Sequence, residues 1–195
     1  MMEEGQLDAQ AWSEALTLYK WLCTFVGVAP REHDEWWLDV GAIMRLETQD
    51  PRGWESIDPY EGEEERLEDP LFPWLETPST TVDAERYRRR VDEIPRSSVR
   101  SLIVLLGAGT SRLDLSKSLG WEERRPEMER RAGVILSRFP DGTRFYTNLG
   151  WKSDHPEFYE QPFRTHAPFS QYDWDAGLIA VNDDEVAVLW NFLSL

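Results

Sequence analysis

Cysteine is nearly absent from this chain of 195 residues, which contains only Cys23. A lone cysteine cannot form an internal disulfide, and a chain of this length buries enough surface to be stable without one. We interpret Cys23 as a buried thiol in a reducing compartment, because it lies in an apolar pattern with no histidine beside it.

Long apolar runs are also missing. No segment approaches the roughly 18 apolar residues that a membrane-spanning helix needs. The first four residues, Met-Met-Glu-Glu, are acidic where a secretory signal would be basic. We therefore expect a cytoplasmic protein with no membrane partner, folded as one globular domain over residues 1–195 and acting as a monomer or homodimer.

Basic residues are scarce, with 21 lysines and arginines against 37 aspartates and glutamates, which gives a net charge of −16. Such a surface repels nucleic acid and anionic lipid, and it attracts basic proteins. Arginines nevertheless gather in a basic band over residues 86–131. The sequence leaves open whether this band pairs with the chain's own acidic residues.

Motifs for metal or nucleophilic chemistry are missing as well. The three histidines are His33, His155 and His166, and no two of them stand three or four residues apart. No Gly-x-Ser-x-Gly elbow and no regular calcium-loop spacing occur. We therefore predict no metal, no cofactor and no catalytic residue, and we expect that the protein is not an enzyme.

One stretch, Gly107–Ser111 (Gly-Ala-Gly-Thr-Ser), resembles the glycine-rich turn of NAD-binding folds, and locally that of sirtuins. The resemblance covers about ten residues. Arg112 stands where the dinucleotide fingerprint has its third glycine. The apolar run before it, Leu102–Leu106, fits a helix or a buried strand, because five apolar residues do not decide between the two periods.

Two elements are predicted near the N-terminus. Apolar residues at helical spacing predict a helix over residues 8–26, with Asp8 as its N-cap and Gly27 as its end. Residues 36–46 alternate, which predicts a half-buried strand with its even-numbered residues toward the core.

Later segments predict the fold class. Residues 82–94 favour a helix. Turn signals favour two C-terminal β-hairpins, one from 134–139 and 143–148 and the other from 177–181 and 185–190. We predict an α+β fold, in which a mainly antiparallel sheet packs against an N-terminal helix and one or two further helices.

A long acidic, proline-rich loop at about residues 50–81 is the most distinctive segment. Nine acidic residues and one basic residue lie between Glu55 and Glu76, interleaved with aromatic residues that disordered acidic linkers usually lack. We expect an ordered loop with a short helix at 62–68. The partner-binding residues that we predict are Trp54, Asp58, Tyr60, Glu61, Glu63, Glu64, Glu65, Glu68, Asp69 and Trp74.

These features favour an acidic protein-binding module that neutralises a basic protein partner. In its general character the chain is similar to bacterial toxin-immunity proteins, which are small, acidic and cytoplasmic, and the partner would then be a nuclease-type toxin. The alternative hypothesis is a small nucleotide-binding protein or enzyme that uses the Gly107–Ser111 turn.

Overall fold

The computed structural model describes residues 7–20, 23–58, 63–108, 115–150, 154–159 and 165–193. Its centre is a five-stranded antiparallel sheet in the order β1-β7-β6-β3-β2, and the short strands β4 and β5 pair separately. The strands are β1 (Thr24–Pro30), β2 (Asp92–Ile94), β3 (Arg144–Thr147), β4 (Leu149–Gly150), β5 (Thr165–His166), β6 (Trp174–Val181) and β7 (Glu185–Leu193). The predicted α+β class with a mainly antiparallel sheet is confirmed.

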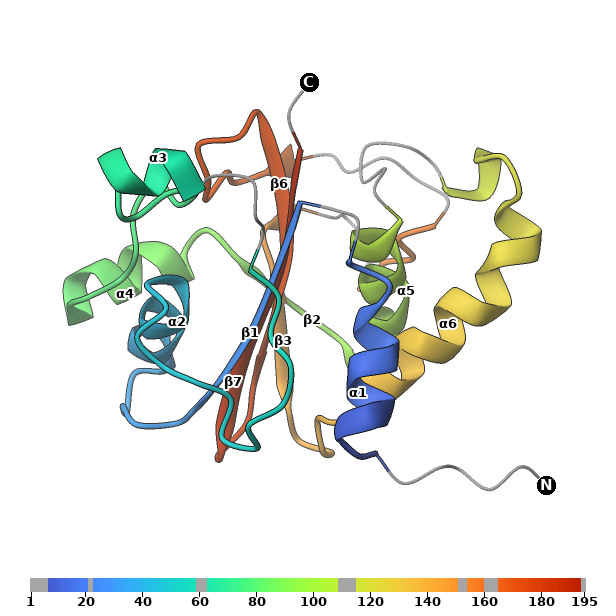
Figure 1. Ribbon diagram of the computed structural model, residues 1–195, viewed down its shortest axis with the longest axis horizontal. Coiled ribbons are helices and arrows are strands. Elements are labelled where there is room, and N and C mark those ends of the chain that lie inside the picture. The colour runs from blue at the N-terminus through green and yellow to red at the C-terminus, as the bar shows by residue number, and fades with distance from the viewer. Residues whose placement is uncertain are drawn as a thin grey trace.

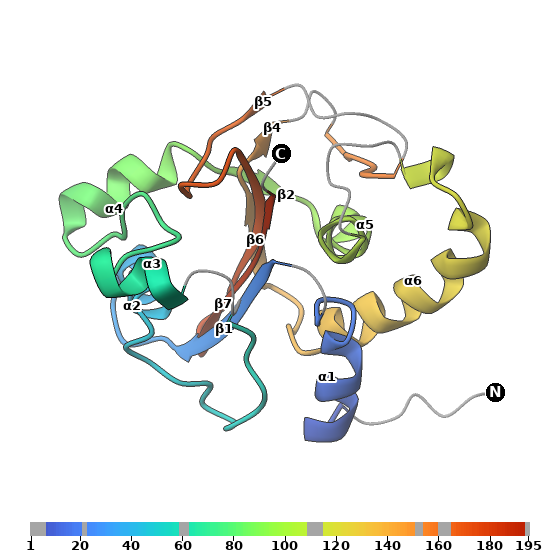
Figure 2. The same ribbon diagram turned by 45° about the horizontal axis from the view of Figure 1, so that its top comes forward.

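Helices cover both faces of the sheet (Figure 1). One layer holds α2 (Trp36–Met44), α3 (Glu63–Glu68) and α4 (Thr81–Arg88). The other holds α1 (Ala9–Leu16), α5 (Arg96–Gly107) and α6 (Trp121–Ser137), with the 3-10 turn η1 (Leu115–Lys117) before α6. Figure 2 shows the sheet edge-on between the two layers. None of the described helices is long and apolar enough to cross a membrane.

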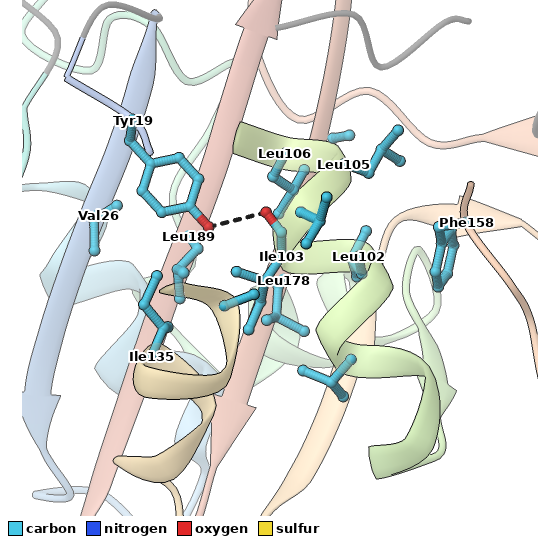
Figure 3. Close-up of a cluster of buried hydrophobic side chains, with 14 of the residues drawn as sticks. Tyr19, Val26, Leu102, Ile103, Leu105, Leu106, Ile135, Phe158, Leu178 and Leu189 are labelled. Atoms are coloured by element: carbon cyan, nitrogen blue, oxygen red, sulfur yellow. Dashed lines mark hydrogen bonds between the residues drawn. The ribbon is translucent and has the colours of Figure 1, made fainter. Parts of the chain in front are cut away.

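The sheet is buried on both faces, and every residue of β6 is buried. On the side of α1, α5 and α6, the apolar residues of α5 form the centre of the larger core cluster. There the hydroxyl of Tyr19 donates a hydrogen bond to the carbonyl of Ile103 at 3.2 Å (Figure 3). Burial raises the pKa of Tyr19 well above its usual value, so this hydroxyl stays a donor.

The predicted helix over 8–26 is only partly right. Asp8 caps α1 as expected, since its carboxylate accepts from the Ala11 amide at 2.8 Å. The helix ends at Leu16, however, and the chain enters β1 at Thr24. Gly27 lies inside this strand, where a Cβ would stand 2.6 Å from Ile43 of α2. Its missing side chain therefore lets α2 approach the sheet.

The predicted strand over 36–46 is wrong, because these residues form α2. Trp36, Trp37, Val40 and Ile43 recur at helical spacing, and all four are buried. Nearly every position in this segment is apolar, so the alternating pattern is a subset of a broad helical face. The alternation also assigned Leu46 to the core, yet its side chain is 54% exposed.

The segments between residues 82 and 106 form two helices and a short strand. Residues 82–94 divide into α4, which Thr80 caps, and the edge strand β2. The Leu102–Leu106 run is helical and belongs to α5, in which every one of these side chains is fully buried. The short helix expected at 62–68 is confirmed as α3.

Of the two predicted hairpins, only the second forms. Strands β6 and β7 pair across the Asn182–Asp184 turn with Val181 opposite Val186. Residues 134–137 instead complete α6, whose buried residues Met128, Ala132 and Ile135 face the core at helical spacing. The Pro140-Asp-Gly turn therefore joins a helix to β3, and β3 pairs with β2 and β6.

Candidate partner-binding face

Arg138 anchors the beginning of the acidic segment. Its guanidinium is fully buried, and it donates to both oxygens of Asp50, at 2.6 and 2.9 Å, and to both oxygens of Glu185, at 2.9 and 3.0 Å. The guanidinium carbon also lies over the rings of Trp12 and Trp54, 4.7 and 5.2 Å from their centroids. The predicted site residue Trp54 is thus half-buried, and it fixes the loop from inside.

Arg66 holds α3 in place. Its terminal nitrogens donate to both oxygens of Asp58 at 2.6 and 2.7 Å, and its Nε donates to the Phe72 carbonyl at 3.0 Å. One side chain thereby ties the helix to chain on both sides of it. The single basic residue of the predicted acidic stretch therefore acts as an internal brace, in the bidentate geometry that arginine favours.

The end of the segment is fixed to the sheet. Gln171 donates to the carboxylate of Asp69 at 2.7 Å, and the Leu75 amide donates to the Phe169 carbonyl at 2.9 Å. Trp74 is 1% exposed and packs edge-on against Trp190. Trp74 is therefore a core residue that no partner reaches in this structure, and we leave it out of the proposed surface.

Asp175 supports the loop that receives this end. Its buried carboxylate accepts from the backbone amides of Phe169 and Ser170 at 2.9 and 2.8 Å, and from the Ser170 hydroxyl at 2.7 Å. It also accepts from Trp190 Nε1 at 3.0 Å and from Asn148 Nδ2 at 2.9 Å. A buried carboxylate with five donors is fully satisfied, so its role is to hold the loop.

The acidic side chains of α3 remain available. Glu64, Glu65 and Glu68 are exposed, and none of them has an ion pair with any described residue. Leu67 lies between them and is 86% exposed. Tyr60 and Glu61 lie outside the described residues, as does the side chain of Glu63.

The basic band at 86–131 does not neutralise the exposed glutamates of α3. Arg86 and Arg90 both pair with Glu76, which lies at the end of the acidic stretch. The arginines of α6 pair within their own helix, as Arg130 and Arg131 do with Glu127. The band therefore folds back onto the acidic segment at one position, and the glutamates of α3 keep their charge.

A hollow of about 280 Å³, which we call the edge hollow, lies between β1 and residues 46–58. Its walls include Val28 of β1, Ile43 of α2, and Leu46, Ile57 and Asp58 of the following segment. Leu46 and Asp58 also line a smaller recess that Arg66 and Pro70 complete. The edge hollow therefore adjoins the smaller recess, which reaches Arg66 of α3.

A second cleft, of about 330 Å³, contains a histidine–aspartate pair that the sequence did not reveal. His33 Nδ1 lies 2.6 Å from Asp39, a carboxylate that is 2% exposed. Arg31 donates to the other oxygen of Asp39 at 3.1 Å. This contact assigns the Nδ1 proton to the bond with Asp39, so Nε2 is the acceptor of the neutral ring.

The sequence did not predict this pair, because Asp39 was assigned to the solvent-facing side of a strand, six residues beyond His33. As a helix, the same residues bring Asp39 back onto the loop before α2. Within the described part of the chain, no group of three or more His, Cys, Asp or Glu is placed to hold a metal ion.

The Gly107–Ser111 turn does not have the setting that the nucleotide hypothesis needs. A dinucleotide turn follows a strand, whereas Gly107 ends the helix α5. A Cβ at Gly107 would stand 3.1 Å from Leu18 Cβ, so this glycine serves helix packing. Residues 109–111 lie outside the described residues.

Comparison with known proteins finds no matching family model, no matching curated protein and no matching solved structure.

Proposed function

We propose that this protein is an acidic protein-binding module that acts in the cytoplasm and neutralises a basic protein partner. By its general character, the role would be that of a toxin-immunity protein whose partner is a nuclease-type toxin. The acids of α3 steer a positively charged surface toward this face, and an apolar residue among them anchors it.

One observation carries the proposal. Leu67 is 86% exposed on a helix whose neighbouring glutamates have no cation among the described residues, and that helix is braced by Arg66 and Asp58. An exposed leucine costs solubility and contributes nothing to this core. A rigid helix with an apolar anchor and a charged rim is the arrangement that protein interfaces use, and its rigidity lowers the entropy lost on binding.

The test uses the native neighbourhood of the gene. Basic proteins that are encoded beside this gene are co-expressed with this protein, and cell survival and complex formation are measured. Against a partner so identified, we expect the triple reversal Glu64→Lys, Glu65→Lys and Glu68→Lys to slow association at least tenfold at low salt, and less at high salt.

The matched control reverses Glu14, Glu122 and Glu123, which are exposed on α1 and α6 in the opposite layer. It changes the net charge by the same amount, and we expect association to slow by less than threefold. Equal effects of the two triple variants would contradict a directed acidic face. Thermal unfolding of both variants verifies that each one folds.

A further inference from the structure

The outer edge of β1 is only partly paired. The Val26 amide donates to the Ile57 carbonyl at 2.7 Å, and the Ile57 amide donates back to Val26 at 2.9 Å. Because backbone groups alternate along a strand, Val28 and Pro30 present theirs on the same outer side. Pro30 has no N–H, so pairing along this edge can extend from Ile57 by a short distance only.

Val28 lies between Val26 and Pro30 on this edge, and its outer backbone groups are unpaired among the described residues. The residue is 3% exposed. Buried backbone donors and acceptors are nearly always paired, because leaving them unpaired costs as much as a lost hydrogen bond. The edge hollow lies against this position. The geometry therefore provides space where a strand would continue the sheet.

Leu46 follows the end of α2 and lines the edge hollow. It has a φ of +58°, a left-handed conformation that is rare for a leucine, and its side chain is 54% exposed. The positive φ belongs to the C-terminal cap of α2, in which the Leu46 amide donates to the Ile43 carbonyl and the Glu47 amide donates to the Ala42 carbonyl, both at 3.0 Å. Glycine is the usual residue at this position of a cap, so the helix end does not itself call for an exposed leucine.

The size and charge of the site favour one type of occupant. The hollow holds about 280 Å³, which is close to the lower end of the range for ligand pockets, roughly 300–1,000 Å³. It accommodates a short length of extended chain with one apolar side chain. Beyond Leu46 and Asp58 the surface continues to α3, where the carboxylates of Glu64, Glu65 and Glu68 favour a cationic neighbour.

We propose that an extended segment of the basic partner adds to the sheet at the outer edge of β1. Its backbone pairs with Val28, one apolar side chain enters the edge hollow beside Leu46, and its lysines or arginines point toward α3. This mode of recognition gives affinity through backbone bonds and specificity through alternate side chains. The inference rests on the proposed function, because it names how that partner is held.

The experiment uses a blocked peptide of sequence Lys-Lys-Val-Thr-Val-Lys-Lys and the full chain labelled with ¹⁵N. We expect a saturable shift of the Val28 amide signal, and hydrogen exchange of that amide slowed at least tenfold at saturation. A series of peptides, each N-methylated at one position, tests the backbone pairing. Because Val28 is the open position on this edge, strand addition predicts that methylation weakens binding at least tenfold at the peptide residue opposite Val28, and that methylation of its two sequence neighbours is tolerated.

Two results would overturn the inference. One is the absence of any Val28 response up to millimolar peptide, and the other is binding that no single N-methylation weakens. A further outcome is that charge reversal on α3 slows association of the native partner although the peptide leaves the Val28 amide signal and its exchange unchanged. That result would support the proposed function and contradict this docking mode. If the peptide binds at Val28 but the α3 variants match their control, the docking edge stands without the steering surface.

Leu46→Gly gives an independent variant. Glycine adopts a φ of +58° without strain, so we expect the thermal stability to be kept or raised. The loss of the apolar contact should nevertheless weaken the peptide at least fivefold. Leu75→Gly, at another leucine that is 53% exposed but outside the hollow, is the control and should leave peptide binding unchanged. Equal binding by both variants counts against the role of Leu46.

Discussion

Arg138 and Asp50 form a bidentate ion pair with both side chains buried, at 2.6 and 2.9 Å, although they are 88 residues apart in the chain. Glu185 shares the same guanidinium, so one cation joins the end of α6, the start of the acidic segment and the first residue of β7. Burial opposes the charge on Arg138, but the hydrogen bonds that it donates to Glu185 and Asp50 outweigh burial and raise the pKa of the guanidinium.

Removal of this cation should be costly. Arg138→Ala leaves two buried carboxylates without their cation, and we expect a loss of about 3–5 kcal/mol in the free energy of unfolding. Urea denaturation measures it. Arg86→Ala breaks a pair in which Arg86 is 57% exposed, and that change should cost less than about 1 kcal/mol. A loss for Arg138→Ala no larger than for Arg86→Ala would contradict the anchoring role.

The five donors around Asp175 give a second prediction. Asp175→Asn replaces one acceptor oxygen by an NH₂ group that faces other donors, so we expect a loss of at least ~2 kcal/mol in stability. Amide exchange of Phe169 and Ser170 should accelerate with it. Asp183→Asn, in the exposed turn between β6 and β7, should stay within about 0.5 kcal/mol of the parent. Unchanged exchange at Ser170 would refute the loop-holding role.

The His33–Asp39 contact predicts a tautomer. The neutral imidazole of His33 should carry its proton on Nδ1, because Asp39 accepts there at 2.6 Å. Long-range ¹H–¹⁵N NMR of the ring reports this directly. We expect Asp39→Asn to shift the population toward the Nε2–H tautomer, whereas Glu32→Gln on the same loop should leave it unchanged. A ring that is protonated mainly on Nε2 in the parent protein would show that the contact does not fix it.

Acid should weaken one surface network in α6. Hydrogen bonds from Arg130 and Arg131 lower the pKa of Glu127 from 4.5 to about 2. A depressed pKa contributes stability above pH 4.5, and that contribution is lost as the pH falls toward 2. Glu127→Gln should therefore lower stability at pH 6 by under ~1 kcal/mol, because the pair is half exposed.

The difference between parent and Glu127→Gln should shrink steadily in denaturation curves from pH 4.5 to pH 2. Glu123→Gln is the control, because Glu123 is exposed on the same helix and has no ion pair with a described residue. A constant difference for Glu127→Gln across this pH range would show that the pair does not set the pKa.

Local signals predicted the elements whose pattern had one interpretation. Asp8 caps α1, the turn at Asn182–Asp184 closes a hairpin, and the acidic stretch contains a short helix. The signals failed where apolar residues were continuous. Residues 36–44 and 134–137 carry apolar patterns that suit either period, and burial against the sheet or against other helices made both helical.

The sequence likewise predicted one part of the candidate site and not the other. The charge of the site is local information, so the exposed glutamates of α3 were named from the sequence. Which aromatic residues face a partner is not local. Trp74 is sealed in the core and Trp54 lies against Arg138, and both placements depend on residues far along the chain. The Asp39–His33 pair and the open edge at Val28 follow from the same long-range packing.

The sequence by itself determined the excess of acidic charge, the absence of a covalent staple and the α+β class, because composition and short-range turns and caps are properties of neighbouring residues. Only the tertiary structure decided that α2 is a helix, that Arg138 joins three segments, and that β1 is an edge strand with Val28 open. Those outcomes come from burial and strand order, which depend on contacts between residues distant in the chain.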